Sequence, residues 1–223
     1  MLTEGIWNRT GASTMSENLF VRSVAFFTLL EAVLVGGGSL VSYSWEPSWI
    51  LILGSFVGSM VCIFAFTTSE DPVISALGVG GMSVLLGLMI GPLIAMYPAQ
   101  AVILAVVTTA ATMSVMSIVG ILFPATFKGW GPYVMGGLTL LIVAQFAQLF
   151  LIALGVGGAQ SMPLITWAGV VLFVGIVAYD WSQALEMPYT LDNAIDTSGG
   201  LILDAVNLFI RFLQIFGGKG SRR

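Results

Sequence analysis

The stretch LILDAVNLFIRFLQIFG, residues 201–217, is apolar enough for a membrane helix, yet it contains an aspartate and an arginine. At a rise of about 1.5 Å per residue it extends about 25 Å, close to the thickness of the hydrocarbon core of a bilayer. A charged side chain in lipid costs several kcal/mol, so such residues are rare and mark functional sites. The stretch therefore predicts a transmembrane helix in which Asp204 and Arg211 contact protein or water.

The composition of the whole chain indicates an integral membrane protein. Of its 223 residues, 57% are hydrophobic and 8% are charged, and the mean hydropathy is +1.01; soluble domains lie far from these values. The polar amino-terminal residues lack the apolar core and cleavage site of a signal peptide, so we expect the first apolar helix to stay as an anchor. A net charge of −4 without a basic cluster argues against a nucleic-acid partner and leaves membrane lipid as the expected one.

Seven hydrophobic segments follow one another along the chain, separated by stretches rich in Gly, Pro and polar residues. The predicted fold is an all-α integral membrane protein with seven transmembrane helices in one domain, residues 21–217. A polar segment, residues 1–20, precedes this domain, and a short basic tail, residues 218–223, follows it. The expected helices are Val21–Tyr43, Ser48–Thr67, Pro72–Met96, Ala99–Phe123, Tyr133–Gly155, Leu164–Tyr179 and Leu201–Phe216.

Two pairs of glycines suggest where these helices pack closely. Gly54 and Gly58 in the second helix, and Gly87 and Gly91 in the third, are spaced four residues apart. Such spacing lets a neighbouring backbone approach, although glycine is also generally enriched in membrane helices.

The orientation in the membrane depends on a few basic residues. Arg9, Arg22 and Lys128 place the amino terminus in the cytoplasm by the positive-inside rule. With seven crossings the carboxyl terminus then lies outside, whereas the basic tail argues for the inside, and this conflict stays open. We expect a multi-pass protein of a bacterial inner membrane rather than of an organelle membrane.

Several classes of function are disfavoured by missing residues. The chain has no histidine, which argues against haem sites, zinc hydrolases and histidine-dependent proteases. The lysines, Lys128 and Lys219, lie outside the helices, so a retinal protein is also disfavoured. Without a phosphate-binding glycine loop or a GxSxG elbow, we expect neither enzymatic activity nor an organic cofactor.

Acidic residues in or near the membrane are the remaining candidates for a site. Asp180 directly follows the sixth expected helix at the membrane face, and Asp204 lies one turn into the seventh, so antiparallel neighbours would bring both carboxylates together. Such a pair would share a proton or bind a cation such as calcium through its oxygen atoms. Alternatively, the two are separate aspartates at helix ends. The other acids considered are Glu31, Glu186, Asp192 and Asp196.

Two motifs around these aspartates resemble the transmembrane Bax inhibitor motif family. They are VAYDWSQ, residues 177–183, and the opening stretch, residues 201–217. The resemblance implies six helices around a central seventh, with Asp180 and Asp204 as an aspartate dyad at the cytoplasmic side. It also implies a pH-sensitive calcium leak channel or a regulator of cell death and membrane proteolysis. Supporting polar positions within the motifs are Tyr179, Gln183 and Asn207.

The loop after the second helix departs from some bacterial members of this family. Those members carry a basic cluster whose arginine latches onto the dyad, whereas this chain has TTSEDPV, with Glu70 and Asp71. The acidic loop could concentrate cations. Alternatively, Ser69 or Asp71 caps the helix that begins at Pro72.

Glu31 and Arg211 are a second pair of charges, which the family pattern does not lead us to expect. Each lies about 15 Å into its expected helix, and both helices cross in the same direction, so the two side chains would meet at one depth. An ion pair is one interpretation. The other is that Arg211 reaches the far interface, with Glu31 protonated or facing a cavity.

Together with the two intramembrane aspartates, the family resemblance implies a cation leak channel, with calcium as the expected ion, gated by protonation of Asp180 and Asp204. Calcium at these two aspartates would be the bound metal. The alternative is a non-conducting protein that binds a membrane protease or another membrane complex and regulates it.

Overall fold

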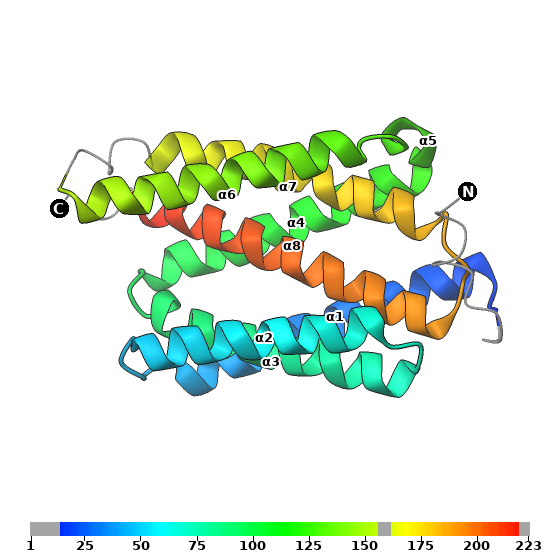
Figure 1. Ribbon diagram of the computed structural model, residues 1–223, viewed down its shortest axis with the longest axis horizontal. Coiled ribbons are helices and arrows are strands. Elements are labelled where there is room, and N and C mark those ends of the chain that lie inside the picture. The colour runs from blue at the N-terminus through cyan, green and yellow to red at the C-terminus, as the bar shows by residue number, and fades with distance from the viewer. Residues whose placement is uncertain (1–13, 156–161, 219–223) are drawn as a thin grey trace. The chain divides into compact units, whose positions relative to one another are not determined.

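The computed structural model describes residues 14–155 and 162–218, and every regular element within these ranges is a helix. Figure 1 shows their order along the chain. Seven of the helices are long and apolar enough to cross a membrane, which confirms the predicted fold class; α5 has four residues. The helices are α1 (Glu17–Ser42), α2 (Trp49–Thr68), α3 (Pro72–Ile94), α4 (Ala99–Leu122), α5 (Pro124–Phe127), α6 (Gly131–Ala153), α7 (Met162–Ala184) and α8 (Leu191–Gly217).

The chain forms two compact units, and α8 contributes one half to each. Unit 1 runs to Tyr97 and adds Ala184–Leu203. In this unit α3 packs against both α1 and α2. Unit 2 contains Pro98–Gln183 and continues from Asp204. In unit 2 the helix α7 contacts α4 beside Gly120 and contacts α6 beside Gly137.

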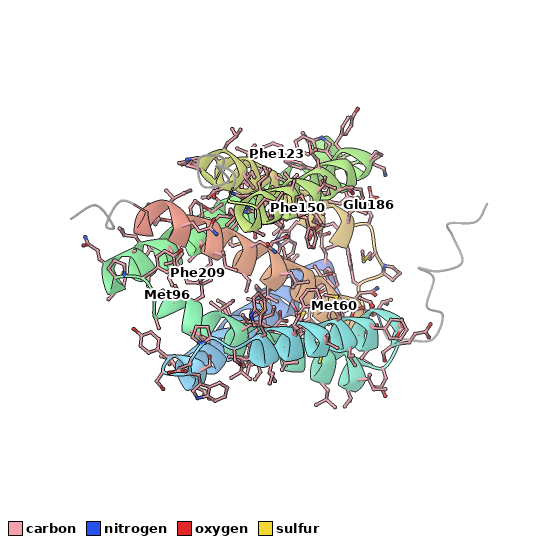
Figure 2. All side chains as sticks on the ribbon, turned by 60° about the vertical axis from the view of Figure 1, so that its left-hand side comes forward. Met60, Met96, Phe123, Phe150, Glu186 and Phe209 are labelled. Atoms are coloured by element: carbon pink, nitrogen blue, oxygen red, sulfur yellow. The ribbon has the colours of Figure 1, made fainter. Side chains whose placement is uncertain are left out.

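Apolar side chains cover the outer faces of the helices. Among those more than a third exposed are four that Figure 2 labels: Met60, Met96, Phe123 and Phe150. A soluble protein would bury such residues, whereas lipid tails solvate them well, and the helices satisfy their backbone groups internally. The exposed surface therefore fits the membrane environment that the composition predicts.

The third helix begins with a cap from the acidic loop. The Oδ1 atom of Asp71 accepts a 2.9 Å hydrogen bond from the backbone N–H of Val73, and Pro72 occupies the first turn. Both features are typical of helix starts. For Asp71 the structure thus shows the capping role that the sequence left as an alternative.

The last helix begins ten residues earlier than expected, at Leu191 instead of Leu201. Thr190 caps it, because its hydroxyl oxygen accepts a 3.1 Å hydrogen bond from the backbone N–H of Asn193. The sixth membrane helix likewise continues to Ala184, past the expected end at Tyr179. Both errors have one cause: the residues concerned are polar enough to suggest a loop, but they are helical and largely buried in protein.

The connection between α7 and α8 is consequently short and is held against the start of α1. The rings of Phe20 and Tyr189 lie 5.0 Å apart, and the backbone N–H of Met15 donates a 2.8 Å hydrogen bond to the carbonyl of Tyr189. Burial raises the pKa of the Tyr189 phenol, and the negative charge of Glu17 adds to this effect. Glu186 lies in the same connection (Figure 2).

Several positions used to predict the orientation lie outside the described residues. They are most of the polar segment 1–20 and nearly all of the tail 218–223, including Arg9, Lys219, Arg222 and Arg223. The cytoplasmic amino terminus therefore stays a prediction.

Candidate functional site

The carboxyl groups of Asp180 and Asp204 share a side-chain hydrogen bond in unit 2. Asp180 lies on α7 and is half-buried, while Asp204 lies on α8 and is 5% exposed. Ionised carboxylates only accept hydrogen bonds, so a bond between two carboxyl groups requires a proton on one of them. A hydrogen bond between these two carboxyl groups would thus leave the pair with one proton and one negative charge.

Asp204 lies farther from the start of α8 than the expected helix boundaries implied. Asp180 is about one turn from the end of α7 at Ala184. Asp204, however, follows the start of α8 at Leu191 by more than three turns, instead of one turn. The extra turns are the polar residues that the sequence analysis assigned to the connection.

The supporting polar residues Tyr179, Gln183 and Asn207 lie on α7 and α8 near the two aspartates. Tyr179 is half-buried, and its hydroxyl lies against α6, where a methyl group added at Gly131 would be 3.0 Å from the hydroxyl oxygen. Gln183 and Asn207 are half-buried one turn beyond Asp180 and Asp204, respectively. The Oδ2 atom of Asp204 has no hydrogen-bond partner among the described residues.

A polar stripe continues from the pair along the second half of α8, toward its carboxyl end. Its members are spaced three or four residues apart and therefore share one face of the helix. The stripe contacts α7, because Gln214 Oε1 accepts a 3.0 Å hydrogen bond from the Thr166 hydroxyl. The polar stripe consists of Asp204, Asn207, Arg211 and Gln214.

Arg211 packs against α7 within this stripe and is 5% exposed. Its guanidinium lies 5.4 Å from the centre of the Phe173 ring and donates a 3.4 Å hydrogen bond to the carbonyl of Ile165. The missing side chain of Gly169 provides the space, since a methyl group there would overlap the guanidinium. Arg211 is therefore held by protein within unit 2. Glu31 belongs to unit 1, so its ion pair with Arg211 stays a prediction.

Unit 1 contains buried polar contacts that the sequence analysis missed. Ser198 lies 2.5 Å from Glu31 Oε1, joining α8 to α1. The Ser75 hydroxyl donates a 2.7 Å hydrogen bond to Asp192, joining α3 to α8. A sequence signal for this part of α8 did exist, because a threonine followed two residues later by an aspartate is typical of a helix start.

The contact between Ser75 and Asp192 gives a stability prediction. Asp192 is 2% exposed, so removing a hydroxyl that donates to it should cost about 1–2 kcal/mol. We expect Ser75→Ala to lower the thermal unfolding temperature in detergent. Ser83→Ala is the matched control, since Ser83 is on the same helix and equally buried, but its hydroxyl has no partner among the described residues. Equal losses in both variants would contradict the assigned hydrogen bond.

The aspartate pair has the donor chemistry that calcium prefers. Calcium takes six to eight oxygen ligands, with carboxylates prominent among them. The described residues contain no group of three or more His, Cys, Asp or Glu side chains positioned for a metal. Asp180 and Asp204 would thus be the acidic ligands, with water or backbone oxygens completing the shell.

Comparison with known proteins identifies the family. The sequence profile described as "Inhibitor of apoptosis-promoting Bax1" matches residues 17–221. The protein belongs to this family. The match confirms the resemblance noted in the two motifs and extends it over all seven membrane helices of this Bax inhibitor family protein.

Bacterial relatives are about 30% identical over the parts of the sequence that align. The protein YrjE of Lactococcus lactis is 29% identical, over 89% of this chain and 93% of its own length. The inner membrane protein YbhL of Escherichia coli is also 29% identical, over 61% of this chain and 60% of its own length. A protein of Caulobacter vibrioides is 30% identical, over 60% of this chain and 55% of its own length.

Proposed function

We propose that this Bax inhibitor family protein is a pH-sensitive leak channel for cations, with calcium as the favoured ion. The observation that supports it is the hydrogen bond between Asp180 and Asp204 within two membrane-spanning helices. Ionisable groups in such helices are costly and typically belong to ion pathways or proton relays.

Protonation of the pair would control its attraction for cations. With one proton, the pair carries a single negative charge. Loss of that proton would leave two negative charges at hydrogen-bond distance, which repel each other and attract a divalent cation. Gain of a second proton would remove the charge, weaken the attraction and permit a different packing of α7 on α8. Cation entry is thus favoured in the deprotonated state.

Calcium flux into liposomes at several pH values tests the proposal. The Asp180→Asn and Asp204→Asn variants keep the size and hydrogen-bonding capacity of the side chains but cannot titrate. We expect each to alter calcium flux and to reduce its change with pH several-fold. Asp71→Asn is the control, because Asp71 is an exposed helix cap in the other unit, and it should retain the wild-type pH response.

Unchanged flux in both pair variants would favour the second candidate, a non-conducting protein that regulates a membrane protease or another membrane complex. Location in a bacterial inner membrane belongs to the same proposal, which is supported by the similarity to the inner membrane protein YbhL.

A further inference from the structure

Glu31 occupies a buried position that the aspartate pair does not explain. It lies in the middle of α1, is 2% exposed, and its Oε2 atom has no hydrogen-bond partner among the described residues. We propose that Glu31 is a second proton-binding site, occupied in this structure, whose proton holds α1 against the first half of α8 through Ser198. The proposal concerns unit 1 and does not depend on ion flux through the aspartate pair.

The position of the proton follows from the hydrogen bonds of Ser198. Its hydroxyl oxygen lies 2.5 Å from Glu31 Oε1 and 2.7 Å from the carbonyl oxygen of Ile195. A serine hydroxyl has one proton to donate, and its oxygen can accept from a second donor. If that proton goes to the Ile195 carbonyl, as serines in helices commonly arrange, the short contact with Glu31 needs a proton on the glutamate. Glu31 is then the donor and Ser198 the acceptor.

Within the described residues of unit 1, no positive charge lies beside Glu31 to stabilise an ionised form. The helices α2 and α3 carry no charged residue, and their one ionisable side chain is Cys62. On α1, Arg22 is exposed and lies more than two turns from Glu31. The titratable groups on the first half of α8 are both acidic, Asp192 and Asp196. Within unit 1 an ionised Glu31 would thus be a buried charge without a cation beside it, and a proton on the glutamate avoids this cost.

Release of this proton would weaken the contact between α1 and α8. Glu31 could no longer donate a hydrogen bond to Ser198. The single hydroxyl proton of Ser198 could then go either to the Glu31 carboxylate or to the Ile195 carbonyl, but not to both. The new negative charge would lie in a site that is 2% exposed, so the helices would have to separate enough to admit water or a cation. Because Ser198 and Asp204 both lie on α8, this second proton acts on the helix that also carries Asp204.

Infrared spectroscopy of the purified full-length protein tests the protonation directly. A protonated carboxylic acid has a carbonyl stretch that an ionised carboxylate lacks. We expect such a band at neutral pH that disappears in Glu31→Gln and persists in Asp204→Asn. Ser198→Ala should shift the same band, because it removes the acceptor of the proton. Absence of any band that depends on Glu31 at neutral pH would overturn the proposal.

Thermal unfolding in detergent gives a second readout. The amide of Glu31→Gln can donate to Ser198 as the protonated acid does, so its unfolding temperature at neutral pH should stay close to that of the wild type. At alkaline pH the wild type should lose stability, by on the order of 5 °C, while Glu31→Gln should not show this loss. A Glu31→Gln protein that fails to fold, or that shows the same pH dependence as the wild type, would contradict a neutral Glu31.

Discussion

Replacing Gly87 with alanine is expected to destabilise unit 1 by about 3 kcal/mol or more. Gly87 lies on α3 where the helix crosses α1, and an added methyl group would overlap the carbonyl oxygen of Val35 and lie 3.0 Å from the Cα of Gly38. Both neighbours are backbone atoms, so no side-chain rotation can relieve the clash. The two helices would have to move apart, losing packing along their shared face. Thermal or denaturant unfolding in detergent measures the effect.

Gly54→Ala is the matched control for this prediction. Gly54 is also inside a membrane helix of unit 1, but a methyl group there would meet no atom within 4 Å. Because alanine has the higher helix propensity, we expect Gly54→Ala to be neutral or to stabilise the protein by up to about 1 kcal/mol. Similar losses of unfolding free energy for both variants would show that α3 does not contact the α1 backbone closely at Gly87.

The glycine pairs illustrate how far spacing alone predicts packing. For Gly87 and Gly91 the expectation is right, since both meet the backbone of α1. The same spacing in α2 does not have this role, because Gly58 meets the Leu85 side chain and Gly54 meets nothing nearby. Sequence spacing defines a face of a helix, but the packing of the neighbours decides whether that face is covered.

The helix boundaries were predictable where a helix meets lipid along its length. The expected and observed bounds of α2, α3, α4 and α6 agree within two residues. The start of α8 was not predictable from hydropathy, because hydropathy measures compatibility with lipid, whereas Asp192 and Ser198 are buried against protein. Polar residues bonded to other side chains can lie in a helix that an apolar window rejects.

The residues of the candidate site were likewise only partly predictable from the sequence. Asp180 and Asp204 were found because their motifs resemble those of a family and both residues are acidic. The partners of Glu31 and Asp192 were missed because they are serines, whose role depends on which helix lies opposite. A serine in an apolar sequence carries no signal of its partner.

These contacts explain how α8 accommodates charged and polar residues. In its first half, Asp192 and Ser198 bond to Ser75 and Glu31 of unit 1. In its second half, the polar stripe contacts α7 of unit 2. Half of the apolar stretch of α8 is buried, the largest share among the described membrane helices. Its charged groups are thus held by neighbouring helices instead of lipid.

Gly169→Ala is expected to destabilise unit 2 by about 2–3 kcal/mol through Arg211. A methyl group at Gly169 would overlap the guanidinium, which would have to leave the Phe173 ring and the Ile165 carbonyl. A cation that is 5% exposed has few other positions that satisfy it. The added methyl group is small, but it displaces the Arg211 guanidinium, which cannot move at low free-energy cost.

A double-mutant cycle with Arg211→Ala separates this mechanism from a general intolerance of alanine at Gly169. Arg211→Ala alone should destabilise unit 2, because it removes the packing on Phe173 and leaves a cavity beside α7. In that background the methyl group of Gly169→Ala enters the vacated space, so its cost should vanish or become a small gain. We expect a coupling of about 2–3 kcal/mol, within the range for residues in direct contact. Additive losses, measured by unfolding in detergent, would mean that Gly169 is required for another contact and that Arg211 does not depend on it for its place against α7.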